Sequence, residues 1–145
     1  MSADLYHEAI LAEARRSEGA GRLDRPDAVV ERDNPLCGDR IRIEARIEEG
    51  RVRVLRHTTR GCLLTRAAAS LLAREAPGRT PAELGRLADD LARWLAGGGA
   101  PPAPSLALFA PVRTVASRHD CVLLPFRAAA GLATPGDDGV PPRAR

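Results

Sequence analysis

Residues 40–48 alternate strictly between apolar and charged side chains, and this pattern constrains the fold more than any other feature of the chain. The apolar set is Ile41, Ile43, Ala45 and Ile47, and the charged set is Arg40, Arg42, Glu44, Arg46 and Glu48. A period of two predicts a half-buried β-strand. Glu49-Gly50 then predicts a tight turn, and residues 52–57 predict a returning strand. The two strands should form an antiparallel hairpin.

Helical patterns lie on both sides of this hairpin. Composition predicts a short strand at 28–31 and helical segments at 3–16, 63–76, 81–96, 105–112 and 121–132. Thr80-Pro81-Ala82-Glu83 is a capping box with proline at the first helical position. Proline is tolerated in the first turn of a helix, so Pro125 places Cys121 at the start of the last helix.

The length and composition are those of one compact domain. The chain has 145 residues and a hydrophobic content of 44%, which is enough to bury a single core. We expect residues 1–132 to form this domain. Residues 133–145 are dominated by Pro, Gly, Asp and Arg, and we expect them to be a disordered tail.

The charged residues exclude several classes of function. Every basic residue is arginine, so the chain has no lysine for a pyridoxal-phosphate Schiff base or for a phosphate-binding P-loop. Net charge is only +3 and aromatic content is 3%, which gives little support for a nucleic-acid partner. Neither a membrane-spanning apolar stretch nor a secretory signal pattern occurs, so we expect a cytoplasmic protein without membrane partners.

Three cysteines carry the strongest functional signal. An odd number in a reducing compartment argues against disulfides and leaves buried thiols, a metal site or sulfur chemistry. Cys37 and Asp39 lie in the loop that enters the hairpin, and Cys62 lies just beyond its exit. Antiparallel pairing brings these two ends together. Cys62 also precedes a helix, and a helix N-terminus favours the thiolate.

Cys121 at the start of another helix would allow three thiols and one carboxylate to converge. Zn(II) accepts such a set in tetrahedral geometry, and the carboxylate is its more exchangeable member. The intervals between the cysteines match no compact zinc-finger spacing, however. The residues alone therefore leave a second interpretation open, in which the cysteines are small buried apolar side chains, Gly38 is a turn glycine and Asp39 is a solvated acid.

Three motifs in order resemble a known family. They are Asn34-Pro35-Leu36-Cys37-Gly38-Asp39, then Gly61-Cys62 with Ala67-Ala68-Ala69-Ser70, then residues 118–124 around Cys121. Together they resemble the iron-sulfur cluster assembly proteins of the NifU N-terminal type, IscU and SufU. The long interval between Cys62 and Cys121 is similar to the SufU branch.

This resemblance implies an α+β fold with a small antiparallel three-stranded sheet packed against several helices. It implies that Cys37, Asp39, Cys62 and Cys121 are metal or cluster ligands. SufU-type proteins bind Zn(II) and accept persulfide sulfur from a pyridoxal-phosphate cysteine desulfurase, SufS in that system, for downstream iron-sulfur assembly proteins. IscU-type proteins assemble a transient [2Fe-2S] cluster on the same residues.

The SufU resemblance assigns persulfide acceptance to Cys37, as in a zinc-dependent sulfurtransferase, whereas an IscU-like chain would use Cys121. Arg118 and His119 are candidates for supporting roles. Asp120 before Cys121 and Arg60 before Gly61 depart from the family pattern, and both bear on partner docking. Two alternatives to sulfur acceptance stay open: a [2Fe-2S] assembly scaffold, and a noncatalytic adaptor that uses zinc only for folding.

Overall fold

The computed structural model describes residues 7–36 and 38–133 and has an α+β architecture. The helices and strands in chain order are α1 (Glu8–Arg16), β1 (Ala28–Asn34), β2 (Asp39–Glu48), β3 (Arg51–Arg60), α2 (Leu63–Glu75), α3 (Pro81–Leu95) and α4 (His119–Ala130). Short 3-10 helices occupy Pro104–Thr114, Ala116–Arg118 and Gly131–Ala133. The strands form one antiparallel sheet in the order β1-β2-β3, which confirms the predicted fold class.

The predicted hairpin is formed by β2 and β3. Glu48 pairs with Arg51, and the two residues between them, Glu49 and Gly50, have φ angles of 53° and 78°. Positive φ at both central positions is the turn geometry whose twist matches that of the flanking strands. One extra residue, Arg53, lies between the partners of Arg46 and Ile47, so the register shifts at that point. β3 runs three residues further than predicted, to Arg60.

Strand β1 is longer than the predicted segment 28–31 because it pairs with the whole first half of β2. The pairing runs from Ala28 opposite Ala45 to Asn34 opposite Asp39. Cross-strand ion pairs accompany it: Arg42 Nη1 lies 3.0 Å from a Glu31 carboxylate oxygen, and Arg40 Nε lies 3.2 Å from one of Asp33. The polar residues at the end of β1 are thus held by partners on β2, which the local sequence pattern does not show.

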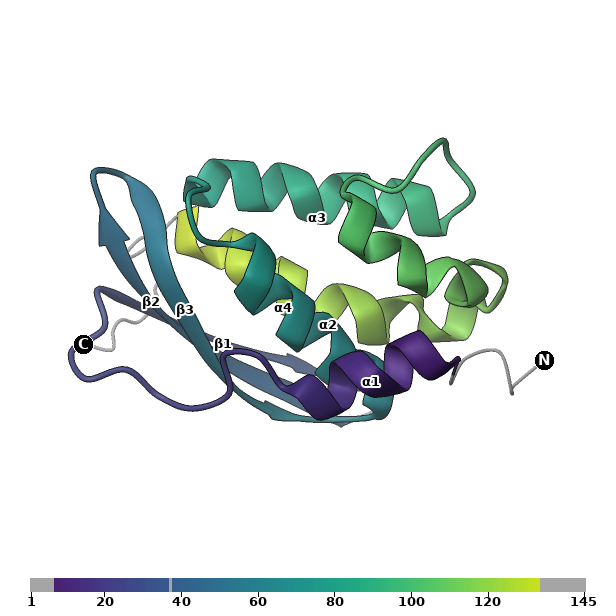
Figure 1. Ribbon diagram of the computed structural model, residues 1–145, viewed down its shortest axis with the longest axis horizontal. Helices are drawn as coiled ribbons and strands as arrows, with labels where there is room; N and C mark the ends of the chain where they lie inside the picture. The colour runs from purple at the N-terminus through teal and green to yellow at the C-terminus, as the bar shows by residue number, and fades with distance from the viewer. Residues whose placement is uncertain (1–6, 37, 134–145) are drawn as a thin grey trace.

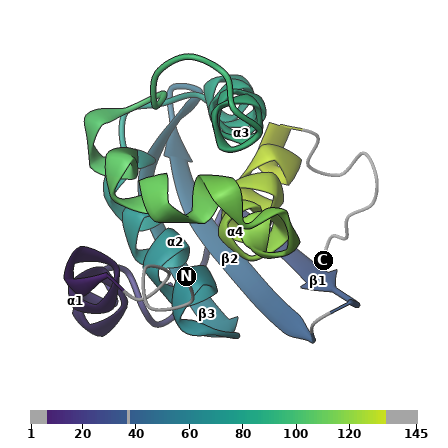
Figure 2. The same ribbon diagram turned by 90° about the vertical axis from the view of Figure 1, so that its right-hand side faces the viewer.

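The helices gather on one face of the sheet (Figures 1 and 2). Ile41 and Ile43 on this face are fully buried. Helix α2 packs on β3, α4 packs on β1 and β2, α3 covers α4, and α1 lies beside α2. Phe109 and Phe126 are the largest fully buried side chains of the core. This packing sets the starts of α2 and α4 beside the same end of the sheet.

Glu44 departs from the simple alternation, because it belongs to the charged set of β2 but is buried. The segment before β1 covers it: the backbone N–H of Leu23 donates to Glu44 Oε1 at 2.7 Å. Arg42 Nε donates to the other oxygen at 2.8 Å. Burial acts to raise the pKa of Glu44, but the Arg42 and Leu23 hydrogen bonds outweigh it and lower the pKa overall.

The outer edge of β3 is covered at two places by loop backbone. His57 N–H donates to Gly19 O, and Gly21 N–H donates to His57 O, both at 2.9 Å. Near the hairpin turn, Val52 N–H donates to Arg79 O and Val52 O accepts from Gly78, both at 2.8 Å. These contacts satisfy backbone groups that would otherwise be open to another strand.

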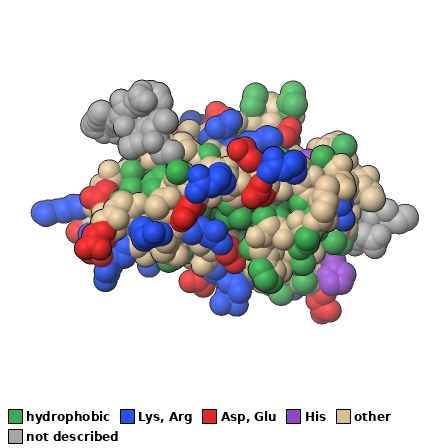
Figure 3. All heavy atoms as spheres, turned by 90° about the horizontal axis from the view of Figure 1, so that it is seen from above, with side chains coloured by type: hydrophobic (Ala, Val, Ile, Leu, Met, Phe, Trp, Pro, Cys, Tyr) green, Lys and Arg blue, Asp and Glu red, His purple; other side chains and the backbone are tan. Residues whose placement is uncertain are grey.

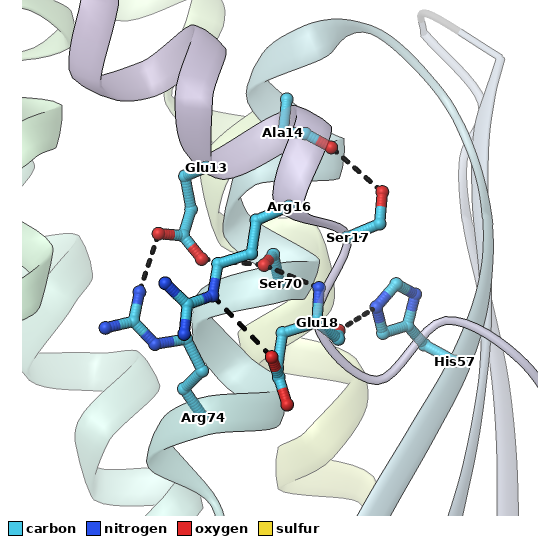
Figure 4. A network of polar contacts seen from close by, with 8 residues as sticks. All are labelled: Glu13, Ala14, Arg16, Ser17, Glu18, His57, Ser70 and Arg74. Atoms are coloured by element: carbon cyan, nitrogen blue, oxygen red, sulfur yellow. Dashed lines mark hydrogen bonds and ion pairs between the residues drawn. The ribbon is translucent and has the colours of Figure 1, made fainter.

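A buried polar network fixes α1 against α2 and β3 (Figure 4). Glu13 of α1 accepts hydrogen bonds from Ser70 Oγ and Arg74 Nη1 of α2, both at 2.6 Å. Ser70 Oγ also accepts the N–H of Glu18 at 2.9 Å. The Glu18 carbonyl in turn accepts from His57 Nε2 at 2.9 Å, while Thr59 Oγ1 lies 2.8 Å from His57 Nδ1. His57 is therefore held as a neutral ring with the proton on Nε2.

Two predicted helix starts have different outcomes. The capping box of α3 is confirmed, because Glu83 N–H donates to Thr80 Oγ1 at 3.1 Å and Thr80 N–H donates to Glu83 Oε1 at 2.9 Å. The prediction that Pro125 lies in the first turn of the last helix is wrong. Helix α4 begins at His119, two residues before Cys121, and Pro125 lies inside it. Because proline has no N–H, the Cys121 carbonyl receives no helical hydrogen bond from residue 125.

The surface that carries α3 has intermixed charges. Figure 3 shows basic and acidic side chains interspersed over this face, and the exposed charged residues of α3 are of both signs: Arg86, Asp89, Asp90 and Arg93. Within residues 7–36 and 38–133, no helix has the length and apolar character needed to cross a membrane.

The buried His57 generates a prediction about acid stability. Burial lowers its pKa, the Glu18 carbonyl opposes this effect, and the charge of Arg56 adds to it. Because the unfolded chain binds a proton near pH 6.5 and the folded chain does not, stability should be full above that pH and should fall as the pH drops below it. NMR titration of the His57 ring should give a pKa below 6.5. A value at or above 6.5 would contradict the neutral, buried assignment.

Candidate metal centre

Three potential metal ligands meet at the end of the sheet where β2 starts and β3 ends. They are a carboxylate oxygen of Asp39 and the sulfur atoms of Cys62 and Cys121, and the three atoms lie within 4.8 Å of one another. Asp39 is the first residue of β2, Cys62 is the N-cap of α2, and Cys121 is in the first turn of α4. The structure thus joins three of the four residues named from the sequence as ligands.

The hairpin register places Asp39 beside Cys62. Arg40 pairs with Arg60. Asp39, which precedes Arg40, therefore lies next to Gly61 and Cys62, which follow Arg60. Asp39 is only 4% exposed, because Gly61 and the first turn of α2 cover it. A buried carboxylate needs hydrogen bonds or a cation to offset its desolvation.

Thr65 supplies one such hydrogen bond. It lies one helical turn after Cys62 and is fully buried. Its hydroxyl donates to Asp39 Oδ2 at 2.7 Å and lies 3.6 Å from the Cys62 sulfur. Our sequence interpretation did not include Thr65. The available signal was its position three residues after the helix cap, where a side chain can face the capping residue.

Gly61 is required by space. A Cβ at this position would lie 2.9 Å from Asp39 Oδ1 and 3.0 Å from both Asp39 Cγ and Thr65 Cβ. None of these three contacts can relax easily, because Asp39 and Thr65 are both buried. The glycine before Cys62 thus allows the Asp39 carboxylate to approach the start of α2.

The two described cysteines share one proton. The Cys121 thiol donates a hydrogen bond that lowers the pKa of Cys62 to about 5. Burial and the charge of Asp39 oppose this shift, and the backbone N–H of Thr65 adds to it. The pKa of Cys121 is raised by the same hydrogen bond, by burial and by the charges of Cys62 and Asp39, and a hydrogen bond from Arg118 opposes the rise. Cys62 is therefore the thiolate of the pair. A metal ion that binds both sulfurs would displace the shared proton.

Other residues named from the sequence lie around this centre. Arg118 immediately precedes α4 and contacts Cys121 through the hydrogen bond described above. His119 Nε2 lies 3.0 Å from Val112 O and 3.1 Å from Arg113 O, so this nitrogen holds the end of the 3-10 helix Pro104–Thr114. Among the described residues, the ligand atoms that meet do not include His119.

The two departures from the family pattern are exposed or at the rim. Asp120 forms an ion pair of 3.2 Å with Arg127 on the surface of α4. Arg60 is the last residue of β3 and is exposed. Neither residue contributes an atom to the group of potential ligands in the described part of the chain.

Cys37 lies outside the described residues. Its neighbours on both sides are held by Asn34: Leu36 N–H donates to Asn34 Oδ1 at 3.1 Å, and Gly38 N–H donates to Asn34 O at 2.8 Å. Leu36 is 88% exposed. Asn34 therefore fixes the backbone of Leu36 and Gly38, and β2 begins at Asp39 in the centre.

The donor set fits a tetrahedral ion of the zinc type. Zn–S bonds of about 2.3 Å place two sulfur ligands roughly 3.8 Å apart. The observed separations, all within 4.8 Å, need only a small contraction to reach this geometry. Three described ligands leave one tetrahedral position for a fourth donor.

The crowding at Gly61 generates a prediction. Gly61→Ala should displace the Asp39 carboxylate, cost about 1–3 kcal/mol of stability and weaken metal binding. Gly85→Ala is the matched control, because the nearest atom to a Cβ there is Ala130 Cβ at 3.8 Å within ordinary contact distance. This control should be stabilised by about 0.5–1 kcal/mol, since alanine replaces glycine inside α3. Urea unfolding measures both, and equal responses of the two variants would refute the steric argument.

Comparisons with known proteins agree with this fold. Residues 5–104 match the family described as NifU-like N terminal domain, a span that includes Asp39 and Cys62. The chain is similar to the crystal structure of a NifU-like protein (N-terminal) from Brucella abortus, with a TM-score of 0.81 and 34% identity over 89% of this chain and 92% of that chain.

Two further proteins show the same similarity. A putative iron-sulfur cluster assembly scaffold protein for the SUF system from Fervidobacterium islandicum has the same fold, with a TM-score of 0.80 and 19% identity over 89% of this chain and 96% of that one. The iron-sulfur cluster assembly scaffold protein IscU of Thermotoga maritima is 26% identical over 85% of this chain and 88% of its own length. The chain belongs to the NifU-like N terminal domain family.

Proposed function

We propose that this protein acts in iron-sulfur cluster assembly as a zinc-dependent acceptor of persulfide sulfur from a cysteine desulfurase. The observation that carries the proposal is the meeting of Asp39, Cys62 and Cys121 at a largely buried site in a member of this family. Cys37 would be the fourth ligand and the sulfur acceptor. Zn(II), when bound, would keep the thiols deprotonated at neutral pH.

The ligand set favours a metal that can be partly released. Three thiolates and one carboxylate would hold Zn(II), and a carboxylate is the most exchangeable donor of such a set. Asp39 and Cys62 are fixed by the hairpin register and the helix start. Cys37 follows Leu36, which is largely exposed, and precedes Gly38, which is exposed as well. Of the three proposed cysteine ligands, Cys37 therefore has the most accessible neighbours.

The proposed transfer step conserves atoms and electrons. The Cys37 thiolate attacks the outer sulfur of the desulfurase persulfide, and a new S–S bond forms at Cys37. The S–S bond of the partner breaks, and the partner cysteine leaves as a thiolate. This is thiol exchange with a persulfide, and its rate depends on the thiolate fraction and on access to the attacking sulfur. Cys121 is 2% exposed and thus less suited to the attack.

A [2Fe-2S] assembly scaffold is the second candidate function, because the relatives from Thermotoga maritima and Streptococcus pyogenes are named as scaffold proteins. The same residues would hold the growing cluster as cargo. The Streptococcus relative is 27% identical over 86% of this chain. In this case Cys121 rather than Cys37 would receive the sulfur.

A noncatalytic adaptor that needs zinc for folding has less support. The large buried side chains, such as Phe109, Phe126, Leu71 and Leu91, lie in helix-to-helix and helix-to-sheet packing. Cys121 is only one of the many side chains in this core, so we expect apolar packing to form it without a metal. An adaptor of this kind would instead unfold when the metal is chelated.

The implied partners follow from the proposed chemistry. A pyridoxal-phosphate cysteine desulfurase of the SufS kind would supply the sulfur, because this chain has no lysine to hold that cofactor. Downstream iron-sulfur assembly proteins would receive it. We propose a cytoplasmic location for the same reaction.

Persulfide mapping tests the proposed function. The zinc-loaded protein is incubated with a cysteine desulfurase and L-cysteine, alkylated without reductant, digested and analysed by mass spectrometry. We expect one added sulfur atom on the Cys37 peptide, loss of this label in Cys37→Ser and its retention in Cys121→Ser. Retention in Cys37→Ser together with loss in Cys121→Ser would overturn the assignment of the acceptor and favour the scaffold mode.

A further inference from the structure

We infer that Thr65 is a positioning residue that holds the Asp39 carboxylate in the orientation in which it binds a metal. This inference rests on the proposed function, because it assumes that a metal binds between Asp39 and the cysteines. Thr65 is not one of the potential metal ligands, which are Asp39, Cys62 and Cys121. The role comes from the hydrogen bond that Thr65 gives to one oxygen of the carboxylate.

The hydroxyl of Thr65 has a single hydrogen, and the geometry directs it to Asp39. The distance to Asp39 Oδ2 is 2.7 Å, which is a short hydrogen bond to a charged acceptor. The Cys62 sulfur lies farther away, at 3.6 Å. The hydrogen therefore goes to the carboxylate, which is the closer acceptor.

The other carboxylate oxygen is set by Gly61. Oδ1 lies where it would be only 2.9 Å from a Cβ on residue 61, so it sits directly against the backbone of this glycine. The carboxylate plane is thus held by Thr65 on one oxygen and by the close approach of Gly61 on the other side.

Burial makes this hydrogen bond hard to replace. Thr65 is fully buried and Asp39 is 4% exposed, so solvent has little access to Oδ2. A second carboxylate orientation would break this hydrogen bond inside a buried site, which is costly. Threonine also has restricted χ1 rotamers in a helix, and α2 fixes its backbone.

The consequence for metal binding is a carboxylate ligand of fixed orientation. Side chains that hydrogen-bond a metal ligand orient it, and their loss lowers metal affinity about 10–100-fold. Without the hydroxyl, the carboxylate loses the hydrogen bond from Thr65 that helps to fix its orientation. Thr65 would therefore set how firmly the exchangeable ligand of the site is held.

A double-mutant cycle on metal affinity tests the inference. Zn(II) and Co(II) affinities are measured by chelator competition for the wild type, Thr65→Val, Thr65→Ser, Asp39→Ala and the Thr65→Val/Asp39→Ala double variant. We expect a loss of about 10–100-fold for Thr65→Val, and near wild-type affinity for Thr65→Ser. In the Asp39→Ala background, Thr65→Val should cause no further loss. The visible Co(II) spectrum should change with Thr65→Val and be restored by Thr65→Ser.

Matched controls separate positioning from folding. Thr58→Val changes an exposed threonine on β3 and should leave metal affinity unchanged. Circular dichroism checks that each variant is folded, and Thr65→Ala replaces Thr65→Val if the valine variant does not fold.

The outcomes distinguish this inference from the proposed function. Wild-type affinity in Thr65→Val, or an equal loss from this change with and without Asp39, would overturn the role of Thr65 while metal binding by the wild type stands. A wild-type protein that binds neither Zn(II) nor Co(II) would overturn the proposed zinc site itself.

Discussion

The register of the β2–β3 hairpin is the constraint on which the candidate site depends. With Arg40 opposite Arg60, Asp39 lies at the start of one strand while Gly61 and Cys62 follow the end of the other. A slip of one residue would move Ile41 and Ile43 from the core to the outer face, which the helices on the inner face oppose. The apolar pattern of β2 thus stabilises the sheet and sets the distance between Asp39 and Cys62.

Long-range packing completes the arrangement. Cys121 reaches the other two ligands only because α4 lies across β1 and β2, with Phe126 in the core. On the far side of α2, Glu13 and Ser70 join α1 to the same helix that starts at Cys62. The site therefore lies where three separately packed elements begin. Its polar groups satisfy one another, as the hydrogen bonds among Asp39, Thr65 and the two cysteines show.

Local patterns predicted the elements whose signals are local. The alternation of 40–48, the turn at Glu49-Gly50 and the capping box at Thr80 all correspond to observed structure. Cys62 was expected at a helix start, and it is the N-cap of α2. In each case the determining contacts lie within a few residues in the chain.

Features that depend on distant partners were missed. The polar end of β1 is a strand only because β2 provides pairing and arginine partners, and Glu44 is buried only because the segment containing Leu23 crosses it. Pro125 is accommodated inside α4, where tertiary packing outweighs its local cost. Thr65 is an ordinary helix residue by pattern, and its role depends on Asp39, which is distant in sequence.

Metal analysis tests the central claim most directly. The protein is purified without oxygen or added metal, and zinc, iron and acid-labile sulfide are determined per chain for the wild type and Cys62→Ser. Our account predicts about one zinc per chain without sulfide in the wild type, and a clear loss of zinc in Cys62→Ser. Iron with matching sulfide would contradict the zinc assignment, and a wild-type chain without any of the three would contradict the metal centre.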